Sequence, residues 1–129
     1  MWVDNSLKVG NKAPKIETTE GINVGYDANS EGKTKIINFW TPKNADSRIA
    51  NKKLSHQFGV NPSEDIEFIS ICTDSDEALM NDVMRIDGVN ADNNYAYSSI
   101  NPRAFKDYGV EKHPRTFMIA PDGKIEKIM

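Results

Sequence analysis

Residues 34–48 offer the clearest setting for chemistry in this chain. Residues 44–47 (Asn-Ala-Asp-Ser) stand where an apolar run over 34–40 gives way to a helical pattern. At such a strand-to-helix turn the first backbone N–H groups of the helix point outward, and the helix dipole favours an anion or a thiolate. Yet residues 44–47 contain no thiol, no histidine and no strong base. The sequence therefore shows a setting for chemistry more clearly than it shows an activity.

The other reactive side chains are few. Cys72 is the only cysteine, so the chain can form no internal disulfide, CxxC pair or cysteine zinc cluster. Because it ends an apolar strand pattern, we expect a buried, inert thiol rather than a redox sensor. His56 and His113 lack the spacing of a zinc-binding helix, and Asp74 and Asp76 lack the glycine and distal glutamate of a calcium loop. We therefore expect no metal and no cofactor.

Composition narrows the class of protein. The chain has 129 residues, of which 38% are hydrophobic and 27% charged, as suits a single domain over residues 1–129. A net charge of −3 gives no reason to expect nucleic-acid binding. No apolar run approaches the ~18 residues of a membrane span, and no signal peptide is visible at the N-terminus. The sequence leaves the compartment unknown.

The elements that would position residues 44–47 alternate along the chain. The apolar and turn patterns predict a loosely held N-terminal extension over 1–15 and then a hairpin over 16–24. The middle of the chain alternates strands with helices, which predicts parallel pairing, and a final hairpin predicts an antiparallel edge. The expected strands are 34–40, 66–72, 116–119 and 124–129, and the expected helices are 46–58, 76–87 and 102–108.

Both long helices should turn one apolar face to a core, because apolar residues recur there at helical spacing. Charge is uneven as well: the charged residues are mostly basic in residues 33–53 and mostly acidic in residues 63–94. That asymmetry could orient a partner, but we favour two solvated faces. The expected inward residues are Ile49, Ala50, Leu54 and Phe58 in the first helix and Leu79, Met80, Val83 and Ile86 in the second.

With its expected strands and helices in this order along the sequence, the chain resembles the thioredoxin superfamily, in particular the TlpA/ResA-like branch grouped with AhpC/TSA proteins. Val9-Gly-Asn-Lys-Ala-Pro14 resembles the opening vGxxAPxF, and Asn38-Phe-Trp40 resembles NFWAxWCxPC. Residues 108–124 (YGVEKHPRTFMIAPDGK) resemble YxVxxxPTTFLIDxxGxI. The resemblance implies an α/β thioredoxin-like fold, with a mixed central sheet flanked by helices and an N-terminal β-hairpin extension. It also implies that Pro114 is cis and lies beside the start of the first helix.

The chain departs from that family at its centre. Counted from Trp40, the two family cysteines fall on Asn44 and Ser47. Disulfide exchange needs an attacking thiolate and a second, resolving thiol, so we expect no catalytic residue there and favour helix capping for both positions. The family normally adds a C-terminal helix after the last strand, and we expect that helix to be missing here because the sequence stops at Met129. We therefore expect an uncovered sheet face, through which the chain could form a homodimer.

We expect a redox-inactive thioredoxin-like protein whose former active site serves as a groove for a peptide or protein. The alternative is a thiol-disulfide oxidoreductase or peroxiredoxin-like enzyme of redox homeostasis that uses Cys72 or a partner's thiol. A third interpretation is that the chain is one domain of a longer exported protein. Members of the family that the chain resembles are commonly exported in bacteria, so the resemblance implies an extracytoplasmic (periplasmic) location. The expected groove residues are Trp40, Thr41, Pro42, Asn44, Ser47, His113 and Pro114.

Overall fold

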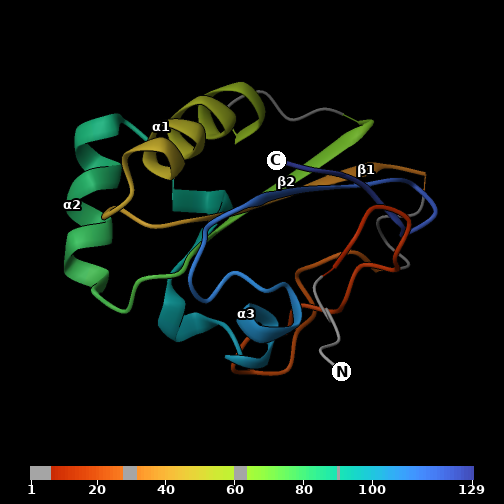
Figure 1. The fold of residues 1–129 in the computed structure, drawn as a ribbon. Helices are drawn as coiled ribbons and strands as arrows, with labels where there is room; N and C mark the ends of the chain where they lie inside the picture. The colour runs from red at the N-terminus through yellow and green to blue at the C-terminus, as the bar shows by residue number, and fades with distance from the viewer. Residues whose placement is uncertain (1–6, 28–31, 60–63, 90) are drawn as a thin grey trace.

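The computed structural model of the chain describes residues 7–27, 32–59, 64–89 and 91–129. The first six residues of the expected N-terminal extension lie outside the described part. Figure 1 shows helices on both sides of one central sheet.

The sheet is mixed and has five strands in the order β3-β2-β1-β4-β5. β1 and β2 run parallel, with Trp40 opposite Cys72, whereas β1 and β4 run antiparallel, as do β4 and β5. The predicted parallel centre and antiparallel edge are both confirmed. The strands are β1 (Thr34–Trp40), β2 (Ile66–Cys72), β3 (Asn94–Tyr95), β4 (Thr116–Ile119) and β5 (Ile125–Ile128).

Two helices cover one face of the sheet and a third covers the other (Figure 1). α1 (Ala45–Leu54) continues as a π-helical turn over Ser55–Gly59 and returns the chain from β1 to β2. α2 (Glu77–Asp87) follows β2, and the short α3 (Arg103–Asp107) lies on the face of the sheet opposite α1 and α2. None of the helices in the described ranges is long and apolar enough to cross a membrane.

Two apolar clusters fill the space on either side of the sheet. On the α3 side, the ring of Phe39 contacts the rings of Tyr108 and Phe117, with centroids 5.2 Å and 5.9 Å away. Burial of such a side chain stabilises the fold by ~1.5–3 kcal/mol. On the α2 side the cluster consists of Trp40, Cys72, Met80, Val83, Met84 and Ala96.

The inward face of α1 is polar, which corrects the expected apolar face. Ser47, Asn51 and Ser55 are the buried residues, at spacings of four. Ile49 is 52% exposed, and Ala50, Leu54 and Phe58 are only half-buried. These polar side chains can be buried because they are hydrogen-bonded. The spacing of apolar residues in the sequence does not reveal such hydrogen bonds, so it did not predict this buried face.

The prediction for α2 is closer to the structure. Met80 and Val83 are buried and Leu79 is half-buried, whereas Ile86 is 69% exposed and Met84 takes its place. The helix ends at Gly88, as expected, with a φ of 66° that favours glycine.

The N-terminal extension is held in place over its described part, contrary to expectation. Residues 10–13 run beside β5, with hydrogen bonds from Gly10 N to Ile125 O (2.7 Å) and from Ile125 N to Asn11 O (2.8 Å). β5 is an edge strand of the five-stranded sheet, so its backbone groups were available for this pairing. The predicted hairpin is present as a single bridge between Glu17 and Asn23.

Pro114 is not cis. No peptide bond among the described residues is cis, so the bond between His113 and Pro114 is trans. The cis form was implied by resemblance alone, and an X–Pro bond favours trans by ~0.5–1 kcal/mol unless its surroundings reverse that preference.

The two oppositely charged runs are partly paired with each other, which corrects the expectation of separate solvated faces. Basic residues just before β1, at its start, in the loop after it and in α1 reach acidic residues on β2, after β2 and at the end of α2. These pairs stabilise the packing of neighbouring elements. They are Lys33–Glu67, Lys35–Glu67, Lys43–Asp74 and Arg48–Asp87, at 3.6, 3.2, 3.2 and 2.9 Å.

Candidate functional site

Asn44 and Ser47, on which the two cysteines of the resembled family were expected to fall, form the first turn of α1. Asn44 is the N-cap, and its side-chain oxygen accepts a hydrogen bond from the backbone N–H of Ser47 at 2.8 Å. This bond satisfies one of the N–H groups that a helix start leaves without a partner. The expected capping role of Asn44 is confirmed.

Ser47 ties the preceding loop to the helix. Its hydroxyl oxygen lies 3.0 Å from the carbonyl of Thr41 and 3.1 Å from that of Asn44, two acceptors for its one proton. The same oxygen accepts from the backbone N–H of Thr41 at 3.1 Å. All of these partners are backbone groups, and no side chain among the described residues that could act as a base is hydrogen-bonded to Ser47. The hydroxyl therefore serves the structure and is not poised as a nucleophile.

A groove of 370 Å³ lies beside this turn. It brings together four of the predicted groove residues, Asn44, Ser47, His113 and Pro114. Its other lining residues were not predicted. Two of them lie on α1 and one directly follows Pro114, whereas the rest lie on strands and at a chain end that the fold brings to the groove. The lining residues that were not predicted are Asn38, Phe39, Asp46, Ala50, Arg115, Thr116 and Met129.

Three predicted groove residues do not line this groove. Trp40 is only 1% exposed and packs in the cluster beneath α2, so it cannot contact a ligand. Its indole Nε1 has no hydrogen-bond partner among the described residues. Thr41 and Pro42 lie in the loop between β1 and α1, and Pro42 lines a different hollow on the outer side of α1.

The floor of the groove continues into a buried polar network. Thr116 donates to the side-chain oxygen of Asn38 at 2.8 Å, and the amide of Asn38 donates to Asn51 and to Ser70, both at 3.2 Å. Ser55 also donates to Asn51, at 3.3 Å. Asn38 interrupts an otherwise apolar strand, and this sequence signal could have revealed the network. The network fixes α1 on β1, β2 and β4 and so fixes the groove wall.

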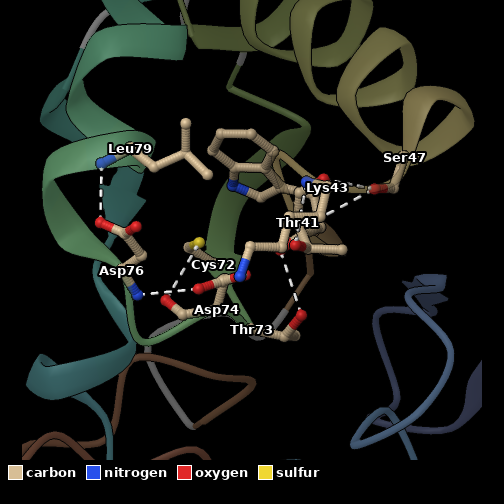
Figure 2. Close-up of polar contacts among 9 residues, drawn as sticks. Thr41, Lys43, Ser47, Cys72, Thr73, Asp74, Asp76 and Leu79 are labelled. Atoms are coloured by element: carbon tan, nitrogen blue, oxygen red, sulfur yellow. Dashed lines mark hydrogen bonds and ion pairs between the residues drawn. The ribbon is translucent and has the colours of Figure 1, made fainter.

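The loops after β1 and β2 are joined at the same end of the sheet (Figure 2). The backbone N–H of Thr73 donates to the carbonyl of Trp40 at 2.8 Å, and Lys43 pairs with Asp74 at 3.2 Å. The backbone N–H of Asp76 donates to Asp74 at 2.8 Å, and this bond, followed by Lys43, lowers the pKa of the Asp74 carboxyl. The first two contacts hold the loop after β1 against the loop after β2, and the third lies within the loop after β2.

The two aspartates here are structural. Asp76 is the N-cap of α2 and accepts from the backbone N–H of Leu79 at 3.0 Å (Figure 2). Within the described ranges, no group of three or more His, Cys, Asp or Glu residues is arranged to hold a metal ion.

Cys72 lies beneath these loops and is sealed from solvent. Its exposed fraction is 0%, and burial raises the pKa of its thiol to about 11. The sulfur donates a weak hydrogen bond to the carbonyl of Asp74, 3.6 Å away (Figure 2). A thiol with this pKa is protonated at neutral pH, so the reactive thiolate is almost absent.

No protein-family model matches the chain, and a search of curated proteins gave no match. Solved structures do match. A thioredoxin-like protein from Parabacteroides distasonis is 23% identical, with 95% of this chain and 88% of that chain covered and a TM-score of 0.74. The thioredoxin domain of a thiol-disulfide oxidoreductase from Bacteroides vulgatus is 19% identical, with 95% and 89% covered and a TM-score of 0.69.

A secreted disulfide oxidoreductase from Mycobacterium tuberculosis is 22% identical, with 91% of this chain and 82% of that chain covered and a TM-score of 0.64. At these identities the likeness concerns the fold. The chain has a thioredoxin-like fold, as its sequence predicted.

Proposed function

We propose that this thioredoxin-like protein binds an extended peptide or protein segment in the groove beside α1 and does not exchange disulfides. The observation that carries the proposal is the state of Asn44 and Ser47. Both side chains are engaged in capping and tying the first turn of α1. Disulfide exchange needs a thiolate at this turn and a resolving thiol, and neither is present.

The groove has the features that a peptide would need. Its walls are α1 on one side and the loop from His113 to Arg115 on the other. In this loop, the backbone groups of His113 and Pro114 make no hydrogen bond with another backbone group of the described residues. Such groups are available to an extended peptide, which could pair with them as an added strand. The side chains of Arg115 and Asp46 would select among the charges on that peptide.

The alternative enzyme would use Cys72 or a partner's thiol. Burial and the raised pKa of the Cys72 thiol weigh against the first form. The secreted structural neighbour supports an extracytoplasmic location, but the proposed binding requires no particular compartment because it uses no thiol of this chain.

Binding is tested by NMR titration of isotope-labelled protein with a reduced and alkylated insulin B chain, an unfolded probe without free thiols. We expect saturable shifts at Asn44, His113 and Arg115. Arg115→Glu should change the affinity, because Arg115 lines the groove. Arg103→Glu, a matched change on α3, should leave it unaltered. Shifts confined to other surfaces, or no saturable shifts, would refute the proposal.

A further inference from the structure

A second hollow lies on the outer side of α1, away from the groove. Its volume is 470 Å³. Ala45, Arg48, Ile49 and Lys52 line it and lie at helical spacing, so they share one face of α1. Pro42 and Lys43 extend the lining into the loop before the helix, and Asp87 adds the end of α2. We call this surface the outer hollow.

Exposed charge in the outer hollow is positive. In the pair between Lys43 and Asp74, the lysine side chain is 64% exposed and the aspartate only 12%. In the pair between Arg48 and Asp87, the corresponding values are 35% and 11%. In each pair the cation is therefore more exposed than the anion, although Arg48 is itself half-buried. Lys52 adds another exposed cation to the lining.

The outer hollow also presents an aliphatic side chain. Ile49 is 52% exposed on this face, although it lies on a helix whose opposite face is buried and polar. Pro42 and Ala45 line the hollow beside it. An exposed isoleucine that shares a hollow with lysine and arginine side chains suits a ligand that carries both carboxylates and an aliphatic group. A small inorganic anion would leave Ile49 in water.

From these observations we propose that the outer hollow docks a short acidic segment of a partner protein, with acidic side chains on the cations and an aliphatic side chain on Ile49. This site is separate from the groove and does not depend on the function proposed for it. Exposed charge pairs steer association and fix register, and the aliphatic contact supplies the buried area.

The test is an NMR titration with a synthetic peptide in which glutamate alternates with leucine. We expect saturable shifts at Lys43, Arg48, Ile49 and Lys52. Lys52→Glu should weaken binding by about twofold to fivefold or more, the effect of an exposed charge pair. Lys53→Glu is the matched control, because Lys53 is exposed next door but does not line the hollow. It should change the affinity by less than twofold.

The aliphatic contact has its own matched pair. Ile49→Ser should weaken binding by about threefold to tenfold, whereas Ile86→Ser, at an exposed isoleucine outside the hollow, should not. Equal effects of the two lysine changes would show general attraction and overturn the proposal. So would shifts elsewhere, no saturable binding, or self-association that is abolished by Ile49→Ser, since the occupant would then be a second copy. Arg115→Glu should have no effect, which separates this test from that of the groove.

Discussion

Ser47 is the donor in both of its contacts with Asn44: its backbone N–H donates to the side-chain oxygen of Asn44 at 2.8 Å, and its hydroxyl lies 3.1 Å from the carbonyl of Asn44. Counted from Trp40, these are the two positions where the resemblance leads us to expect a CxxC pair. Hydrogen bonds thus hold the turn where a dithiol would react. The arrangement stabilises the start of α1 and leaves no group there for thiol chemistry.

The first prediction concerns this turn. Ser47→Ala removes the hydroxyl that accepts from Thr41 N and donates to a carbonyl, so it should lower the free energy of unfolding by ~1–3 kcal/mol. Asn44→Ala removes the cap and should cost ~0.5–2 kcal/mol. Urea denaturation measures both. Because the two residues share a turn, the double variant should lose measurably less or more than the sum of the single losses; strict additivity would contradict the coupling.

The second prediction concerns the buried network. Asn51→Ala removes the acceptor of Asn38, Ser55 and Ser70, leaving buried donors without it, and should lower the free energy of unfolding by ~2–3 kcal/mol. Lys53→Ala on the exposed side of the same helix is the control and should change it by less than ~0.5 kcal/mol. Similar losses in the two variants would mean that the network contributes little.

The inward face of α1 shows where sequence reasoning fails and why. The strands were predictable because β-branched and aromatic runs specify buried strands, and β4 has the predicted bounds of 116–119. Helix periodicity failed for α1 because polar Ser47, Asn51 and Ser55 occupy the buried face. Their partners, Asn38 and Ser70, lie on two different strands, so the compensation exists only in three dimensions.

The candidate site was predictable only in part. Its centre at residues 44–47 and its second wall at residues 113–114 could be identified from the sequence, and the structure places them on one groove. Trp40 could not be excluded from the groove in advance, because its burial depends on Met80 and Met84 of α2. Asn38 and Thr116 were not predicted because only the antiparallel pairing of β4 with β1 brings them together at the groove.

The third prediction concerns pH. Hydrogen bonds from Arg48 lower the pKa of the Asp87 carboxyl in the folded protein below its unfolded value of about 3.9. The pair therefore stabilises the fold above about pH 4, and this contribution is lost as the pH falls through the folded pKa. Asp87→Asn should be less stable than the parent at pH 7, and the difference should shrink towards pH 2 in urea denaturation. Asp82→Asn, in an exposed pair, should show little difference at either pH; a gap for Asp87→Asn that persists at pH 2 would contradict the assignment.

The fourth prediction concerns Cys72. Because its thiol is buried and its pKa is raised to about 11, the native protein should resist labelling by a disulfide reagent at pH 8. Complete reaction should follow unfolding in urea. Asn44→Cys provides the contrast, since an exposed thiol at the start of α1 should label at once in the native state. Rapid labelling of Cys72 in the native protein would instead support the alternative function, an enzyme that uses the Cys72 thiol.

Reduction of insulin disulfides by dithiothreitol, followed by turbidity, separates binding from disulfide exchange when the unaltered protein is compared with Asn44→Cys/Ser47→Cys. The unaltered protein should leave the rate at that of dithiothreitol alone, whereas the double variant, which places two thiols on the same turn, should raise it. Acceleration by the unaltered protein, comparable to that by the double variant, would contradict the claim that this thioredoxin-like fold binds without exchanging disulfides.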